Sequence, residues 1–262
     1  MNEKIKKIIK TLFKKHKKYG FFGNYKNWQQ AVNNSSGYDS QIILEKVKNS
    51  LTKVKNGQAV YERDSVLFSK VQYSWAVLSS LLWISSQKDN RLNLIDFGGS
   101  LGSSYFQNRE LLKHLKDLKW NIVEQKSFME YGKKYFEDEN LKFYESIDEC
   151  LNTNKPDLIL ISSSIQYLEE PYIFIEKIIS YEFEYIIFDR TTFLKNEDRL
   201  TVQKVPPSIY DASYPAWFLN ETKFLKLFKE KYKLISDFDS LAGKINLEDA
   251  TAFEKGFIFK KI

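Results

Sequence analysis

The sequence predicts an α/β fold built on an open, mostly parallel sheet with helices on both faces. Residues 91–105 have the composition of an apolar strand, a glycine turn and a helix start, which together open many sheets of this class. Residues 156–161, PDLILI, are almost entirely apolar, as buried parallel strands tend to be. Two late apolar stretches, Tyr232–Phe238 and Phe253–Lys261, are expected to form an antiparallel hairpin that closes the sheet.

The length and composition favour one domain. The chain has 262 residues, of which 43% are hydrophobic and 16% aromatic, enough for one large core. We expect an extension over residues 1–18 and a single domain over residues 19–262, with an N-terminal cap over 19–90 and the sheet over 91–262. Because the only cysteine is Cys150 and histidines are few, neither an internal disulfide nor a metal site is expected.

Charge is unevenly distributed along the chain. The formal net charge is +6, yet residues 1–18 alone hold eight lysines and one glutamate, so the remaining residues are close to neutral. A nucleic-acid binder usually carries basic residues over its folded face, so nucleic acid is not an expected partner. No apolar run reaches transmembrane length and no secretion signal is recognisable, so we expect a cytoplasmic protein.

Residues 1–18 are predicted to form a basic amphipathic helix. Apolar side chains recur there at helical spacing, with lysines between them. Two interpretations remain open: the helix docks on the domain, or it binds a partner or anionic lipid at the inner face of the membrane. The apolar positions are Ile5, Ile8, Ile9, Leu12 and Phe13.

The segment before the first sheet strand is expected to form the N-terminal cap. Residues Tyr19–Tyr38, which are rich in aromatics, glycine and asparagine, are predicted to be irregular. Gln41–Lys55 has helical periodicity, and a second, long helical stretch is expected up to Ser85. The residues of the first helix expected to face inward are Ile42, Ile43, Val47 and Leu51.

Residues 61–65, YERDS, precede the long helical stretch and allow two interpretations. An arginine or a tyrosine at this position would be able to meet the carboxylate of a bound ligand. Alternatively, Asp64 or Ser65 caps the N-terminus of the helix, with acidic residues in its first turn.

The turn after the first strand predicts a nucleotide-binding site. The dinucleotide pattern G-x-G-x-x-G fails in both reading frames. The looser pattern acidic-x-Gly-x-x-x-Gly, formed by Asp96, Gly98 and Gly102, is typical of the loop that binds S-adenosylmethionine (SAM). Gly99 and Ser100 complete the turn, whose backbone amides and following helix N-terminus would face the ligand. A turn without a ligand, a dinucleotide site or a site for another ligand remain alternatives.

An acidic residue at the end of the second strand supports the same site. Glu124 follows the last glycine of the turn at roughly the 20-residue spacing expected for an acid that binds ribose hydroxyls. An exposed glutamate without a ligand is the alternative. A short third strand over Leu141–Tyr144 is followed by a loop expected beside the adenine. The further cofactor contacts predicted here are Gln125, Ser146 and Ile147.

Polar residues follow the fourth strand. Ser163 is expected beside the cofactor, and Gln166 is expected to orient an acceptor molecule. The alternative is that the hydroxyls of residues 162–164 only cap the next helix.

The end of the fifth strand supplies the candidates for acid–base chemistry. Asp189 is the candidate general base, with Tyr167 or Tyr214 as less favoured substitutes. Arg190 or Arg199 would be able to anchor a phosphate or carboxylate of an acceptor. Equally plausible is that Asp189 and Arg190 form a structural ion pair.

Residues 192–220 form a long connection without clear periodicity. Connections in compact domains are usually much shorter, so one of this length is typically a lid, a binding loop or disordered. Its aromatic side chains, including Trp217, argue against disorder. We therefore predict a substrate cap, with Trp217 in contact with the acceptor.

Several sequence blocks extend well beyond the generic turn. Together they resemble a family of SAM-dependent methyltransferases whose genes tend to occur among those for surface-polysaccharide biosynthesis. The similarity starts near residue 20, so the lysine-rich residues 1–18 lie outside it. The blocks are GNYKNW (23–28), VYERDSVLF (60–68), IDFGGSLGSSYFQNR (95–109), VEQ (123–125), QYLEEPY (166–172), DRT (189–191), DRLTVQ (198–203) and YPAWF (214–218).

The resemblance implies a class I SAM-methyltransferase fold, which is Rossmann-like, with six parallel strands and one antiparallel strand. It implies SAM as cofactor, S-adenosylhomocysteine (SAH) as product, and methyl transfer. The match does not supply the acceptor, for which we predict an oxygen atom of a small molecule or glycan, with nitrogen as the alternative. That acceptor would be a sugar hydroxyl, a nucleotide-linked sugar or a phosphate-type modifying group. The alternative is a non-catalytic SAM-fold protein that binds or organises a polysaccharide assembly complex.

Overall fold

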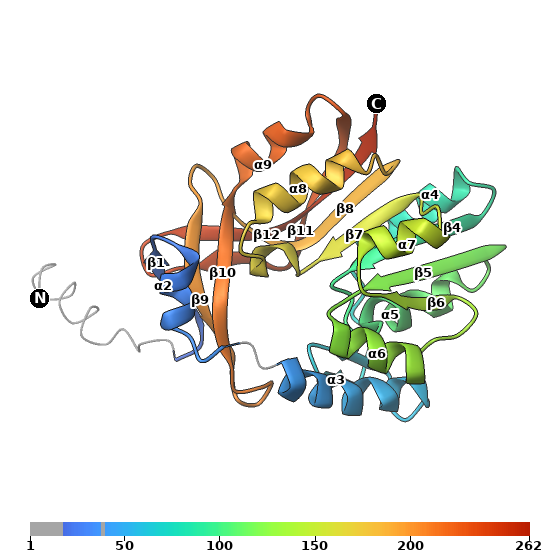
Figure 1. Ribbon diagram of the computed structural model, residues 1–262, viewed down its shortest axis with the longest axis horizontal. Helices are drawn as coiled ribbons and strands as arrows, with labels where there is room; N and C mark the ends of the chain where they lie inside the picture. The colour runs from blue at the N-terminus through green and yellow to red at the C-terminus, as the bar shows by residue number, and fades with distance from the viewer. Residues whose placement is uncertain (1–17, 38–39) are drawn as a thin grey trace, which may run out of the picture.

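The structure, a computed structural model, describes residues 18–37 and 40–262 (Figure 1). The helix predicted over residues 1–18 lies outside the described residues, apart from Lys18. Among the described helices, none combines the length and the apolar character needed to span a membrane.

A seven-stranded sheet forms the centre of the molecule, in the order β6-β5-β4-β7-β8-β12-β11. Strands β6 to β8 of this order run parallel to one another, whereas β12 runs antiparallel to both β8 and β11. Six strands therefore share one direction and one opposes them, which confirms the predicted class I fold. The strands are β4 (Arg91–Phe97), β5 (Asp117–Val123), β6 (Leu141–Tyr144), β7 (Leu158–Ser162), β8 (Tyr185–Leu194), β11 (Tyr232–Asn246) and β12 (Thr251–Lys261).

Helices cover both faces of this sheet (Figure 1). Successive residues of a strand face opposite sides, so Leu94 of β4 packs into one core with α3 to α6, and Ile95 packs into a second core with α7 to α9. The helices are α2 (Trp28–Asn33), α3 (Ser40–Lys55), α4 (Trp75–Ser86), α5 (Ser103–Leu112), α6 (Lys126–Tyr135), α7 (Ile147–Thr153), α8 (Pro171–Ser180) and α9 (Glu221–Phe228).

Three further strands extend the sheet beyond the carboxyl end of β7. In this cap sheet, β9 (Arg199–Lys204) pairs antiparallel with both β1 (Gly20–Tyr25) and β10 (Ser213–Asn220). The end of β10 then pairs with the end of β8. The predictions of an irregular segment near residue 20 and an aperiodic connection over 192–220 are therefore wrong. The inner part of β9 is buried at every position, so it lacks the alternation that marks a half-exposed strand.

A two-strand hairpin, β2 (Tyr61–Arg63) and β3 (Val66–Phe68), occupies the segment expected to begin a helix. Asp64 and Ser65 form its turn, with φ angles of 51° and 68°, as in the tight turns that join twisted strands. They do not cap a helix, because α4 starts ten residues later and its N-cap is Ser74.

Two helix predictions need smaller corrections. The sequence predicts that the helix after the glycine turn continues to Leu118, but α5 ends at Leu112 and β5 starts at Asp117. Helix α3 has the predicted bounds to within one residue, and Ile43, Val47 and Leu51 are buried, but Ile42 is 51% exposed.

The closing hairpin of β11 and β12 is confirmed, but β11 is longer than predicted. Asp239 pairs with Lys255 and Lys244 pairs with Phe253. The four residues Ser240–Gly243 therefore lie opposite Glu254 alone. This bulge re-aims part of the strand toward the carboxyl edge of β8, a common use of bulges beside binding sites.

Candidate functional site

A cavity of about 1100 Å³ opens at the carboxyl edge of the central sheet. The segments after β4, β5 and β6 form one part of its wall, which we call the turn end. The segment after β7, the cap sheet with its β9–β10 connection, and the β11 bulge with the facing residue of β12 form the other part, which we call the cap end. The turn end includes Gly98, Gly99, Ser100, Glu124, Gln125 and Glu145. The cap end includes Gln166, Tyr167, Gln203, Tyr210, Tyr214, Leu241, Ala242 and Glu254.

Close packing explains the two adjacent glycines of the turn. Gly98 has φ +71°, and a Cβ there would lie 2.6 Å from the Cβ of Ser164. A Cβ on Gly99 would lie 2.6 Å from the carboxyl carbon of Asp96. Ser100 and Gly102 also have positive φ angles, 56° and 104°, and α5 begins directly after them. The backbone of Gly98, Gly99 and Ser100 therefore faces the cavity without side chains in the way.

The carboxyl group of Asp96 packs against Gly99 of this turn. It is 1% exposed, and Trp120 Nε1 donates to its Oδ2 at 2.9 Å. Burial raises the pKa of Asp96 to about 7, against the opposing effect of that hydrogen bond. The space beneath Gly99 is thus occupied by a carboxyl group that is partly protonated at neutral pH.

Glu124 lies at the end of β5 and reaches back to the turn. Its two carboxylate oxygens accept from the backbone N–H of Ser100 at 3.1 Å and of Gln125 at 2.8 Å. Burial raises its pKa, although both hydrogen bonds favour the charged form. The structure therefore brings together two features that the sequence placed 22 residues apart, Gly102 and Glu124.

The segment after β7 closes against the ends of two neighbouring strands. Ser163 has φ 55°, and its N–H donates to the carbonyl of Asp189 at 3.0 Å. Ser164 Oγ donates to the carbonyl of Phe97 at 3.0 Å and makes no cap hydrogen bond to the short 3₁₀ helix η1 (Ile165–Tyr167). These serines therefore tie β7 to β8 and β4, and Ser163 lines the cavity.

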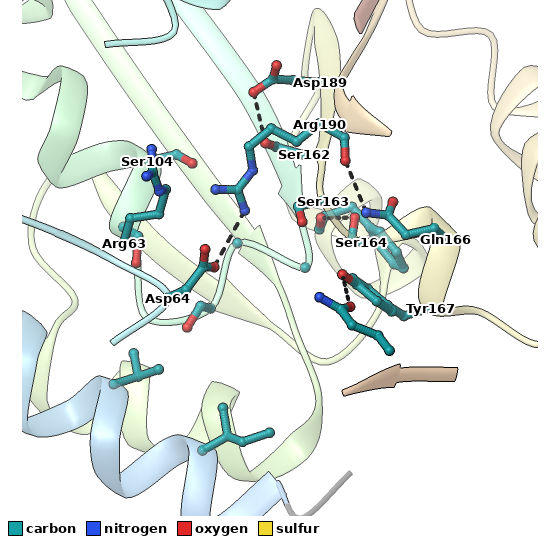
Figure 2. A pocket seen from close by; sticks show the side chains of 18 of the residues that line it. Arg63, Asp64, Ser104, Ser162, Ser163, Ser164, Gln166, Tyr167, Asp189 and Arg190 are labelled. Carbon is teal, nitrogen blue, oxygen red and sulfur yellow. Dashed lines mark hydrogen bonds and ion pairs between the residues drawn. The ribbon is translucent and has the colours of Figure 1, made fainter. Parts of the chain in front are cut away.

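Arg190 projects into the cavity because its backbone is kinked and clamped. It has φ 48° within β8, its N–H donates to Ser240 Oγ at 2.9 Å, and Gln166 Nε2 donates to its carbonyl at 3.0 Å. Figure 2 shows the guanidinium directed across the glycine turn toward Asp64, with Arg190 Nη2 3.5 Å from Asp64 Oδ1. The ion-pair partner of Arg190 is therefore Asp64 of the β2–β3 hairpin and not Asp189.

Asp189 is 4% exposed and is held by two hydroxyl groups. Ser162 Oγ donates to one carboxylate oxygen at 3.1 Å and Ser240 Oγ to the other at 3.0 Å. Burial disfavours the charge on Arg190, but the carboxyl groups of Asp64, Asp189 and Glu254 outweigh it, so the pKa of Arg190 is raised. Asp189 and Arg190 thus belong to one buried network on the cavity wall.

Tyrosine side chains line the cap end. Tyr167 OH donates to Gln203 Oε1 at 2.8 Å, and its ring makes an edge contact with the ring of Tyr214. The hydroxyls of Tyr214 and Tyr210 lie 3.2 Å apart. Burial is the largest cause of the raised pKa of Tyr167. A tyrosine whose pKa is raised is a poor general base at neutral pH.

Four predicted contacts lie away from the cavity. Ser146 caps α7 by accepting from the N–H of Glu149, and Ile147 is buried in the second core. Arg199 is paired with Glu197 and Asp249. Trp217 Nε1 donates to the carbonyl of Glu169. Gly102 also lies outside the lining, since its positive φ serves to begin α5.

The structure adds cavity residues that the predicted set lacked. Arg63 and Asp64 come from the β2–β3 hairpin, which the sequence did show as a candidate ligand segment. Arg63 Nη1 is buried without a hydrogen-bond partner among the described residues. Glu254 of β12 lies opposite the β11 bulge and lines the cavity, and its place between Phe253 and Lys255 carries no functional signal in the sequence.

The two ends of the cavity have different chemistry. The turn end offers backbone amides and a carboxylate, which suit a ribose or another polar group. The cap end combines tyrosines, amides and carboxyl groups. In the part of the chain that the structure describes, no group of three or more His, Cys, Asp and Glu side chains is placed to bind a metal ion.

Comparison with known proteins gives similarity of fold only. No protein-family model matches the chain, and no curated protein sequence matches it. A SAM-dependent methyltransferase from Clostridium acetobutylicum has 12% identity over 72% of this chain and 92% of its own, with a TM-score of 0.44. Magnesium protoporphyrin IX methyltransferase from Synechocystis PCC 6803, solved with bound SAM, has 13% identity over 87% of this chain and 99% of its own, with a TM-score of 0.44. The N-terminal domain of EvdMO1, solved with bound SAH, has 9% identity over 77% of this chain and 90% of its own, with a TM-score of 0.46.

Proposed function

We propose that this protein is a SAM-dependent methyltransferase. The observation that carries the proposal is the contact between Glu124 and the glycine turn at the carboxyl edges of β5 and β4. An acid at this position can accept from both hydroxyls of a ribose, and the turn leaves room for the rest of the nucleoside. The cavity of about 1100 Å³ is larger than most small-molecule sites, so it has space for a second molecule beside the cofactor.

Different cavity residues would hold the adenosine and the amino-acid part of the cofactor. Glu124, Gln125 and Glu145 would hold the adenosine, since they line the cavity beyond β5. Arg63 would hold the amino-acid carboxylate, because its buried Nη1 is without a partner among the described residues. A guanidinium that pairs with a carboxylate is the strong, directional contact expected there.

Methyl transfer from SAM is an in-line displacement in which the cofactor supplies an activated methyl group. The protein's part is to align the acceptor atom with that group, and alignment of this kind can contribute about 7–11 kcal/mol. Asp189 is the proposed general base for a hydroxyl acceptor. Ser162 and Ser240 hold its carboxylate in one orientation, at 3.1 and 3.0 Å.

We propose an oxygen atom of a small molecule or glycan as the methyl acceptor, in surface-polysaccharide biosynthesis. The sequence blocks that resemble the methyltransferase family support this context. The tyrosine and amide side chains of the cap end support a hydroxyl-bearing acceptor. Residues 1–18, with eight lysines, would bring the protein to the inner face of the membrane.

The first test is calorimetric titration with SAM and SAH. We expect micromolar binding by the wild-type protein. Glu124→Gln should bind roughly tenfold to hundredfold more weakly, because hydrogen bonds to a charged group contribute about 1.5–3 kcal/mol. Gly98→Val should not bind, because its side chain would meet Ser164.

The matched control is Glu230→Gln, which removes one exposed carboxylate outside the cavity lining and should bind as the wild type does. A folded wild-type protein that binds neither SAM nor SAH would contradict the proposal. Binding without methyl transfer to any acceptor would favour the non-catalytic alternative.

A further inference from the structure

The charged side chains of the cavity are unevenly balanced. Of the residues that the structure describes, six with carboxyl groups and two with guanidinium groups line it and no lysine does, although the chain as a whole is basic. Arg63 is assigned above to the cofactor carboxylate. The other guanidinium, that of Arg190, lies at the cap end. The carboxyl groups of Asp64, Asp189 and Glu254 all raise the pKa of Arg190.

Arg190 is already engaged by this acidic group. Its guanidinium lies 3.5 Å from Asp64, and its backbone is clamped by Ser240 and Gln166. The positive charge of Arg190 is thus already paired with a carboxyl group of the protein before any acceptor arrives. A phosphate or carboxylate entering this end would meet a negative potential, in a setting where charge interactions are stronger than in water.

Among the described residues, two acceptor groups of the cap end have spare hydrogen-bonding capacity. Gln166 is 1% exposed, and its Oε1 is buried without a partner among the described residues. Glu254 accepts one hydrogen bond, from the N–H of Ala242 in the bulge, at 2.9 Å. An unsatisfied buried acceptor is costly, so a ligand that supplies O–H donors would complete this end.

We infer that the methyl acceptor enters the cap end as an uncharged, hydroxyl-bearing group, and that Glu254 of β12, opposite the β11 bulge, discriminates against anionic acceptors. The hydroxyls of the acceptor would donate to Gln166 Oε1 and to the Glu254 carboxylate. A phosphorylated or carboxylated acceptor would lose those hydrogen bonds and meet repulsion. This inference rests on the proposed function, because it assumes that SAM occupies the turn end.

The test uses stable analogues of SAM that reach into the cap end. In each, nitrogen replaces the sulfonium sulfur and carries a short alkyl arm in place of the methyl group, ending in a hydroxyl or in a phosphate. We expect the hydroxyl arm to bind the full-length protein at least as tightly as SAH does. The phosphate arm should bind about tenfold more weakly or worse, the size expected for unscreened charge repulsion over several ångströms.

Variants show whether Glu254 causes the difference. In Glu254→Gln, the ratio between the two affinities should shrink several-fold, whereas Glu230→Gln should leave it unchanged, because that exposed residue lies outside the lining. Circular dichroism melting confirms that each variant is folded. Equal or tighter binding of the phosphate arm by the wild type overturns the inference, as does a ratio unaffected by Glu254→Gln. Failure to bind SAH itself overturns the proposed function instead.

Discussion

Two carboxyl groups with raised pKa lie on either side of the glycine turn. Asp96 fills the space beneath Gly99, and Glu62, 1% exposed, accepts from Ser103 Oγ at 2.7 Å and from the N–H of Ser65 at 2.6 Å. Burial raises the pKa of Glu62 to about 7, against the effect of both hydrogen bonds. Glu62 joins the β2–β3 hairpin to the first turn of α5, so it positions the hairpin without lining the cavity.

The stability of the protein should depend on pH through Glu62. Below the pKa of the unfolded chain the carboxyl is protonated in both states, whereas between about pH 4.5 and 7 only the folded state retains the proton. This contribution to the free energy of unfolding is therefore lost as pH rises through that window. Glu62→Gln should gain stability relative to wild type across the window, by at most about 1.4 kcal/mol per pH unit.

Urea unfolding of both proteins at several pH values measures this difference. Glu230→Gln provides the control, since it removes an exposed carboxyl group. A difference between Glu62→Gln and wild type that stays constant from pH 4.5 to 7 would show that Glu62 is ionised in the folded protein.

Among the elements, β12 packs closely against both of its neighbours at Gly256. Gly256 lies where a Cβ would come within 2.1 Å of the ring of Phe238 and 2.7 Å of the carbonyl oxygen of Phe188. The first neighbour can move, but the second belongs to the backbone of β8. β12 can therefore approach β8 closely only with glycine at this position.

Gly256→Ala should destabilise the protein by about 1–3 kcal/mol, the usual cost of adding a methyl group where the surroundings cannot yield. Thermal unfolding followed by circular dichroism measures the loss. Thr251→Ala, at the exposed start of the same strand, should change stability by less than about 0.5 kcal/mol. Equal effects of the two changes would mean that the close approach at Gly256 is relieved by movement of β12.

The strands of the central sheet could be predicted because they are apolar runs, such as that of β7, that are buried on both faces. Glycine or polar residues mark where these runs end. The cap sheet could not, because Arg199 and Thr201 are buried within β9 and so disguise a strand as a polar loop. The same contrast holds for the site. Gly98 and Glu124 follow a recognisable spacing, whereas Glu254 lies beside Asp189 and Arg190 because β12 pairs with the distant strand β8.

At the level of the whole molecule, charge is segregated. The lysine-rich residues 1–18 carry the excess positive charge, and the rest of the chain is nearly neutral, with an acidic cavity. Basic segments of this kind are attracted to anionic membranes by about 1 kcal/mol per basic residue near the surface.

Deletion of residues 1–17 should therefore abolish flotation with vesicles that contain phosphatidylglycerol, and leave SAM binding unchanged. The full chain should float with these vesicles at low salt and much less at high salt, because surface attraction is screened. Vesicles of phosphatidylcholine alone serve as the control. Unchanged flotation after the deletion would show that another surface binds the lipid.

The cap sheet is attached to the core by a shared strand. β8 pairs with β7 up to Asp189, and then its last residues, Phe193 and Leu194, pair with Leu219 and Asn220 of β10. A cap built into the same ladder cannot swing on a hinge without breaking these hydrogen bonds. Its stiffness fixes the distance between the two ends of the cavity. If the proposed function holds, a rigid cap would limit the size of the acceptor that the cavity admits.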